Sequence, residues 1–205
     1  MGTPTKILSV GHSTLSYEAF VGRLKSADVT AIADVRSSPF SRHLPHFNRD
    51  VLKDALAHDG ISYVFLGQEL GGRPKGQKYY TDGIADYEKM ATASSFKEGI
   101  CRVKEGSQKY NIAMMCTEHN PLDCHRCLLV GRALIEQDLD VNHILSNGDT
   151  ITHGKIEGQL LSMLGKDEMD MFASPEELRS DAYRERARKV AFTQTKKSSD
   201  TMAAE

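Results

Sequence analysis

Residues 115–126 read MCTEHNPLDCHR, and a short apolar run that begins at Ile112 leads into them. After this stretch, apolar residues recur at helical spacing between Leu128 and Ile135. The pattern predicts a buried strand, a polar turn and the beginning of a helix. In an open α/β sheet, such a turn lies beyond the carboxyl end of a strand, where ligands bind. We therefore expect this turn to carry the chemistry of the protein.

Further apolar runs predict strands, and segments of helical spacing separate most of them. The predicted strands span residues 6–10, 29–35, 61–66, 112–116 and 141–145. The other predicted helices lie in residues 17–24, 48–60, 84–105, 156–164 and 175–192. Alternating strands and helices imply parallel pairing with right-handed crossovers. The sequence therefore predicts a single-domain α/β three-layer sandwich with a mostly parallel central sheet of about five strands.

The length of 205 residues suits one α/β domain, which we place at residues 1–165. A charged helical extension is expected at residues 166–192, and a disordered polar tail at residues 193–205. Residues 67–83 show no regular pattern and are predicted to form a long loop. Residues 146–149 (SNGD) are typical of a hairpin or turn.

The composition is ordinary for a globular protein, and the net charge of −2 gives no global attraction to nucleic acid. No apolar run approaches the roughly 20 residues that a membrane span requires. The first residues lack the apolar core of a signal peptide. We therefore expect a cytoplasmic protein without a membrane partner, whose four cysteines are reduced thiols.

Parallel strands deliver their last residues to the same edge of a sheet. The residues expected to converge at this edge are His12–Ser13, Asp34–Arg36, Gly67–Glu69, Cys116–Glu118 and Ser146–Asn147.

The cysteines of the polar turn have different expected roles. Cys116 closes a buried strand, so either packing or a reactive thiol explains it. Cys124 begins a helix beside His125 and Arg126, a setting that favours its thiolate form. Cys127 lies on an apolar helix face and is predicted to pack.

A metal site is the competing hypothesis, because His119 and His125 accompany the three cysteines of this region. Structural zinc usually draws on two short ligand pairs set well apart, and the region contains one such pair. The sequence therefore predicts no metal, and it does not identify a cofactor.

Two carboxylates, Asp34 and Glu118, lie at predicted strand ends, where they could transfer protons. Arg36 and Arg126 could then hold an anion, and His12 could assist proton transfer. The alternatives are an Asp34–Arg36 ion pair that fixes a loop and a histidine with a purely structural role.

Basic and aromatic residues alternate between residues 36 and 80. The cations could bind phosphates and the rings could stack on bases of single-stranded or flipped-out nucleic acid, although a solvated loop explains them equally well. The residues concerned are Arg36, Arg42, His43, His46, Arg49, Arg73, Lys75 and Lys78, with Phe40, Phe47, Tyr79 and Tyr80.

Several motifs together resemble one known family. They read GHS at residues 11–13, DVRSSP at 34–39 and MCTEHNPLDCHR at 115–126, with further likeness at Tyr63 and at the His143–Ile144 strand. Over about residues 6–160 the chain closely resembles the family named "domain of unknown function 488". The resemblance implies a single α/β domain with two characteristic cysteines, which correspond to Cys116 and Cys124. It implies no particular reaction.

The leading hypothesis is an enzyme, a hydrolase or a transferase, that acts on a small anionic or nucleotide-like substrate, with a base or nucleotide within nucleic acid as one candidate. A non-catalytic module for single-stranded nucleic acid and a metal- or redox-sensing protein are the alternatives. The predicted catalytic residues are His12, Asp34, Cys116, Glu118 and Cys124. The predicted substrate-binding residues are Ser13, Arg36, Arg42, Tyr79, Tyr80, His125 and Arg126.

Overall fold

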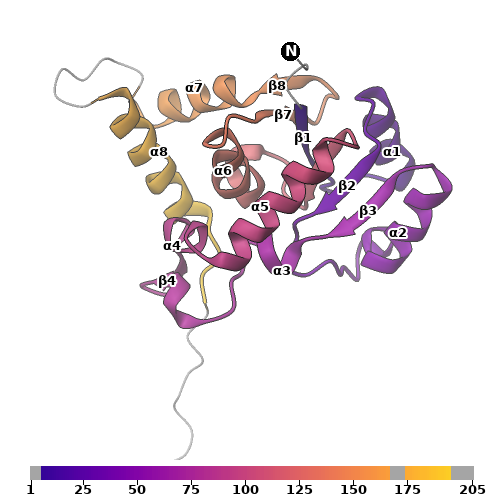
Figure 1. The fold of residues 1–205 in the computed structure, drawn as a ribbon, viewed down its shortest axis with the longest axis horizontal. Helices are drawn as coiled ribbons and strands as arrows, with labels where there is room; N and C mark the ends of the chain where they lie inside the picture. The colour runs from indigo at the N-terminus through magenta and orange to yellow at the C-terminus, as the bar shows by residue number, and fades with distance from the viewer. Residues whose placement is uncertain (1–5, 167–173, 195–205) are drawn as a thin grey trace, which may run out of the picture.

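A six-stranded sheet lies at the centre of the computed structural model, which describes residues 6–166 and 174–194 (Figure 1). Its strands, in spatial order, are β3 (Ser62–Phe65), β2 (Ala31–Asp34), β6 (Ile112–Cys116), β1 (Lys6–Gly11), β7 (Asp140–Ile144) and β8 (Thr150–Thr152). All neighbouring pairs are parallel except β7 and β8. The predicted α/β fold is confirmed. The sixth strand, β8, returns antiparallel through the turn predicted at residues 146–149.

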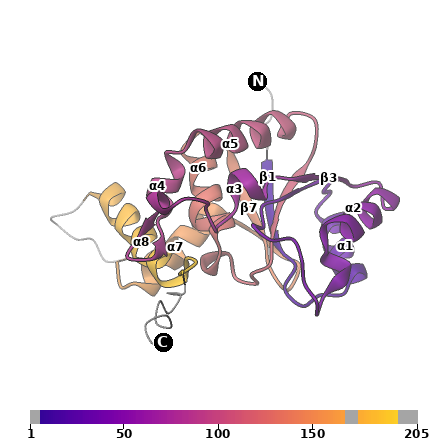
Figure 2. The same ribbon diagram turned by 90° about the horizontal axis from the view of Figure 1, so that it is seen from below.

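Helices cover both faces of the sheet, as Figures 1 and 2 show. On one face, α1 (Tyr17–Ser26) and α2 (Arg49–His58) bury apolar residues such as Phe20 and Leu52. The other face is covered by α5 (Ser94–Ser107), α6 (Arg132–Ile135) and α7 (His153–Met163), and α8 (Pro175–Val190) adds buried residues to the same core from outside them. Alternate residues of each strand belong to the two cores, because successive side chains of a strand point to opposite faces. Across the described ranges, we find no helix long and apolar enough to cross a membrane.

Several short elements lie where the sequence predicted a loop or one long helix. They are α3 (Gly67–Leu70), a 3-10 turn η2 (Gln77–Tyr79), the hairpin of β4 (Tyr80–Thr81) and β5 (Ile84–Ala85), and α4 (Tyr87–Ala91). The prediction of an irregular segment at 67–83 and of one helix at 84–105 was therefore wrong in detail. Elements of two to five residues are too short to show a hydrophobic period.

The helix that follows the polar turn begins irregularly. A 3-10 turn, η3 (Pro121–Asp123), precedes a π-helical turn, η4 (Arg126–Gly131), which leads into α6. All six residues of η4 are buried, including the guanidinium of Arg126. A π-helical turn takes up one more residue than an α-helical turn, and such turns are frequent at functional sites.

The C-terminal helix α8 packs against α4, α7, η3 and η4. Its first residue follows Ser174, which forms a capping box with Glu177. Beyond α8, Thr193 forms a β-bridge with Ile84, and the backbone N–H of Gln194 donates to the carbonyl of Gly83. The predicted disordered tail is therefore wrong for residues 193 and 194. Residues 195–205 lie outside the described residues.

A chain of buried hydrogen bonds connects the sheet with α7 and α8. The hydroxyl of Tyr183 donates to Glu157 (2.9 Å), so it accepts from Nε2 of His153 (2.7 Å). Nδ1 of His153 then accepts from Nε2 of His143 (3.0 Å), and Nδ1 of His143 accepts from the Ser9 hydroxyl (2.7 Å). Each of the two imidazoles therefore donates from one ring nitrogen and accepts at the other, which is the pattern of the neutral form.

Acid should destabilise the protein between about pH 6.5 and pH 4. Burial lowers the pKa of His153 and, with Arg36, that of His12 to about 4, and burial also lowers the pKa of His143. In this range the unfolded chain binds protons that the folded chain does not, so the free energy of unfolding falls as pH falls. Each histidine contributes up to about 1.4 kcal/mol per pH unit.

Denaturant titrations at pH 7, 6 and 5 measure this slope. The variant His153→Gln should have a slope smaller by up to about 1.4 kcal/mol per pH unit, because it removes one titrating group. A free energy of unfolding that stays constant from pH 7 to pH 5 would contradict the neutral state of the three imidazoles.

Gly11 allows the end of β1 to approach the turn after β6. A Cβ atom at this position would lie 1.9 Å from the carbonyl oxygen of Glu118. Gly11→Ala should therefore lower the free energy of unfolding by about 2 to 3 kcal/mol, as overpacking does. Gly22→Ala is the matched control, because nothing lies within 4 Å of its Cβ, and it should stabilise α1 by about 0.5 to 1 kcal/mol. Urea denaturation measures both, and equal effects would refute the close approach.

Candidate functional site

A cavity of about 380 Å³ opens beyond the carboxyl ends of β1, β2 and β6. The turn that follows β6 and the beginning of η4 form its floor, and the loop after β2 forms one side. The end of α8 and Phe192 complete the wall. The cavity therefore lies at the sheet edge at which the sequence predicted a site.

Half of the predicted site residues line this cavity. They are His12, Arg36, Cys116, Glu118, Cys124 and His125. The others do not line it: Ser13, Asp34, Arg42, Tyr79, Tyr80 and Arg126. Two of the five strand ends expected to converge also contribute no lining side chain, namely Gly67–Glu69 and Ser146–Asn147. Glu69 instead pairs with Arg102 on α5.

Two cysteines and a histidine, which we call the sulfur–imidazole triplet, meet at the floor of the cavity. The Sγ atoms of Cys116 and Cys124 each lie 3.8 Å from Nδ1 of His125. The other ring nitrogen, Nε2, donates to the carbonyl oxygen of Val35 at 2.8 Å. Because this bond engages Nε2–H, Nδ1 is the ring atom that faces the two sulfur atoms. Burial opposes a charged ring, but the negative charge of Cys124 outweighs it and raises the pKa of His125.

The pKa values of the two thiols shift in opposite directions, so Cys116 keeps its proton more readily than Cys124. Burial raises the pKa of the Cys124 thiol, but a hydrogen bond from Cys116 and the charges of Arg126 and His125 outweigh it, so this pKa lies well below its usual value. The hydrogen bond to Cys124, together with burial, raises the pKa of Cys116. The backbone N–H of Arg126 also donates to Sγ of Cys124 at 3.5 Å. Cys124 is therefore the more anionic sulfur of the pair.

The side chain of Arg126 is fully buried beneath the polar turn. Its guanidinium donates to the carbonyl oxygens of Glu118 (2.7 Å) and His119 (3.2 Å), and its Nε atom has no partner among the described residues. Within the described part of the chain, no ion pair includes Arg126, so its charge acts on the thiols instead. Arg126 holds the turn in place and does not reach the cavity.

Asp34 is fully buried beside the cavity and fixes Arg36. Its carboxylate accepts from Nε (2.9 Å) and Nη2 (2.7 Å) of Arg36 and from the hydroxyl of Tyr63 (2.7 Å). Arg36 also donates to the carbonyl of Phe47 at 2.9 Å. This geometry matches the ion-pair alternative, so Asp34 acts as a positioning residue.

His12 is held in the same network. Its Nε2 accepts from Nη1 of Arg36 (3.2 Å), its Nδ1 donates to the carbonyl of Ser13 (2.9 Å), and its ring stacks on Phe47 at 4.1 Å. Burial and the charge of Arg36 lower the pKa of His12 to about 4. Both ring nitrogens of this neutral imidazole have protein partners, so His12 shapes the wall of the cavity.

Sequence reasoning did not include several residues of the cavity in the site. Tyr87, at the start of α4, lies within the helix predicted at residues 84–105, but burial and the negative charge of Cys124 raise the pKa of its hydroxyl. Arg73 stacks over the ring of Phe192 at 4.8 Å, and Phe40 lies at the mouth with 66% of its surface exposed. Arg73 and Phe40 were recognised as part of the basic and aromatic segment. No local signal places Tyr87 or Phe192 there, because tertiary packing brings them to the cavity.

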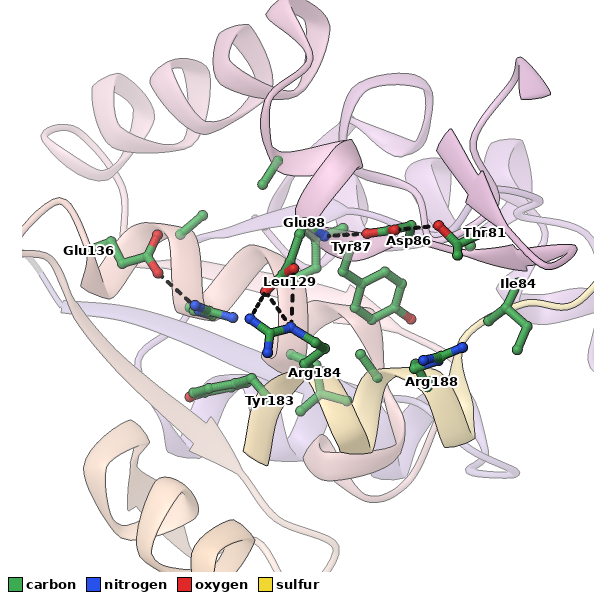
Figure 3. Close-up of a pocket in the computed structure, with 16 residues that line it drawn as sticks. Thr81, Ile84, Asp86, Tyr87, Glu88, Leu129, Glu136, Tyr183, Arg184 and Arg188 are labelled. Carbon is green, nitrogen blue, oxygen red and sulfur yellow. Dashed lines mark hydrogen bonds and ion pairs between the residues drawn. The ribbon is translucent and has the colours of Figure 1, made fainter. Parts of the chain in front are cut away.

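A second cavity, of about 390 Å³, lies between α4, α6 and α8 (Figure 3). Its three arginines are paired with acids: Arg132 with Glu136, Arg184 with Glu88, and Arg188 with Asp82. Its remaining wall is largely apolar. Tyr87 lines both cavities.

Comparison with known proteins identifies one family. The model of the family described as "Domain of unknown function DUF488" matches residues 16–133, which is more than half of the chain and includes both cysteines of the triplet. The resemblance noted for residues 6–15 and 134–160 lies outside this match and stays a prediction. Neither the curated proteins nor the solved structures give a significant match. The chain therefore belongs to the DUF488 family, whose name specifies no activity.

Proposed function

We propose that the protein is a hydrolytic enzyme that acts on a small anionic, nucleotide-like substrate in the cavity at the carboxyl ends of β1, β2 and β6. One observation carries this proposal. The sulfur–imidazole triplet forms the floor of a cavity that also contains the exposed carboxylate of Glu118. This carboxylate has no hydrogen bond or ion pair among the described residues, which leaves it available for proton transfer.

In the proposed reaction, Glu118 accepts a proton from a water molecule in the cavity. The oxygen of that water forms a bond to the electrophilic atom of the substrate, and the bond to the leaving group breaks. The leaving group then takes the proton from Glu118, which restores the carboxylate. Arg36 and Arg73, the cations that line the cavity, stabilise the negative charge that develops on the substrate.

The cations of the cavity support an anionic substrate. Arg73 has an exposed guanidinium that forms no ion pair within the described residues and stacks on Phe192. Arg36 has five N–H groups, four of which have protein partners, so one remains for a ligand. Anions held by arginine form charge-assisted hydrogen bonds, which are the stronger class.

The aromatic ring of Phe40 supports a substrate with a flat group. A large apolar side chain that is 66% exposed at the mouth of a cavity offers a surface for stacking. By contrast, the other three rings expected to bind single-stranded nucleic acid are engaged within the protein. Phe47 stacks on His12 (4.1 Å), Lys78 lies over Tyr79 (5.0 Å), and the hydroxyl of Tyr80 donates to the carbonyl of Pro74 (2.9 Å). A small substrate therefore has more support than an extended strand.

Glu118→Gln should abolish turnover without affecting folding. The amide keeps the shape of the side chain but cannot accept the proton, so we expect kcat to fall by about 100-fold or more. The measurement is hydrolysis of a panel of nucleoside mono- and diphosphates, nucleosides and nitrophenyl phosphate esters by the full chain. Glu136→Gln, on the second cavity, is the matched control and should retain full activity.

Equal activity of wild type and Glu118→Gln would refute the proposed proton transfer. Binding of single-stranded oligonucleotides that weakens steeply with salt, without turnover of any panel member, would favour a binding module instead.

Phe40→Ala should weaken binding of ring-bearing substrates. Loss of one stacking contact is worth about 1 to 3 kcal/mol, so we expect KM to rise about 5- to 150-fold with little change in kcat. A substrate with a phosphate group but no flat ring should be unaffected. Tyr110→Ala removes another exposed ring, outside the cavity, and serves as the control. A uniform loss of kcat for all substrates would show that Phe40 supports the fold and does not bind the ring.

A further inference from the structure

We propose that Cys116, Cys124 and His125 bind a zinc ion and leave one coordination position open toward the cavity. Binding of the ion follows from the geometry of these three residues alone. Its catalytic role, activation of the attacking water, rests on the proposed hydrolytic function.

The spacing of the three side chains fits a tetrahedral ion. Both sulfur atoms lie 3.8 Å from Nδ1 of His125, and all three atoms lie within 4.8 Å of one another. Zinc binds sulfur at about 2.3 Å and nitrogen at about 2.0 Å, which puts the two ligand atoms about 3.6 Å apart in a tetrahedron. A small inward movement of the sulfur atoms would therefore complete the site.

The surroundings of the three ligands are those of a metal site. Nε2 of His125 donates to the carbonyl of Val35, so the ring is fixed with Nδ1 toward the sulfur atoms. A metal-binding histidine usually donates its second ring N–H in this way. The backbone N–H of Arg126 donates to Sγ of Cys124. The buried guanidinium of Arg126 adds positive charge that favours thiolates, the form in which cysteine binds metals.

The number and type of ligands indicate a catalytic zinc site. Among the residues that the structure describes, this group has three members, all of which line the cavity. Structural zinc sites are closed by four protein ligands, whereas catalytic sites have three and hold a water molecule at the fourth position. Thiolate and imidazole ligands select zinc over magnesium or calcium. Such a water is a stronger acid than bulk water, and Glu118 lies in the same cavity to accept its proton.

A second group, formed by Cys127, His143 and His153, is also close enough to hold an ion. It differs in one decisive respect. All four ring nitrogens of its histidines have hydrogen-bond partners within the protein, in the chain that runs from Ser9 to Tyr183. Nδ1 of His125, in contrast, faces only the two sulfur atoms. We therefore assign the zinc ion to the triplet.

Elemental analysis tests this assignment. The full chain, purified under reducing conditions without chelators and dialysed against metal-free buffer, should contain about one zinc ion per molecule. Cys116→Ser and Cys124→Ser should each lower the zinc content at least tenfold. Two controls should keep it: Cys101→Ser removes the exposed cysteine, and Cys127→Ser removes the thiol of the second group.

Cobalt substitution tests the same site in the wild-type protein, so its result does not depend on whether the cysteine variants fold. Cobalt-loaded protein should show the sulfur-to-cobalt charge-transfer band of thiolate ligands, and alkylation of the apoprotein should abolish that band. Metal-free protein with a Cys116–Cys124 disulfide would overturn the proposal, as would zinc that is lost only in Cys127→Ser.

The metal result and the activity result are separable. Zinc at the triplet combined with full activity of Glu118→Gln would leave the ion in place and refute the hydrolytic mechanism. Activity that depends on Glu118 in protein stripped of metal would refute the catalytic role of the zinc ion and leave the proton transfer, while the elemental analysis alone decides whether the ion binds.

Discussion

A single buried cation organises the centre of this molecule. The guanidinium of Arg126 is removed from water without a carboxylate partner among the described residues, which is costly unless other groups compensate. The carbonyls of Glu118 and His119 and the nearby thiols provide that compensation. The same contacts fix the turn that carries Glu118 and set the charge of the sulfur pair. The shape of the turn and the chemistry of its floor therefore depend on one side chain.

The wall of the cavity is rigid for a similar reason. Asp34, Arg36 and His12 form a continuous set of hydrogen bonds in which each acceptor is matched to a donor. Tyr63 contributes one further donor to the carboxylate. Groups fixed in this way need little reorganisation when charge develops on a substrate, which is the main requirement of electrostatic catalysis. The network gives the cavity a preset shape in which one N–H group of Arg36 lacks a protein partner.

The sequence predicted the fold well, because its strands are short apolar runs and its major helices have clear periods. The polar turn was also recognisable, since thiols, imidazoles and a carboxylate rarely crowd one connection. The roles within it were harder to predict. Arg126 was expected to bind an anion, yet it lies beneath the turn, because a sequence does not reveal that η4 widens into a π-helical turn with every residue buried. Tyr87 and Phe192 reach the cavity through packing between distant segments, which leaves no local pattern.

The end of α8 forms part of the cavity wall, although it lies outside the segment that matches the family. Phe192 and Val190 line the opening, while the triplet lies wholly within the matched segment. The residues proposed to react and some of those at the entrance of the cavity thus belong to separate stretches of the polypeptide. Over evolution, such an arrangement would let the entrance diverge, by exchange of a terminal segment, while the sulfur–imidazole floor stays unchanged.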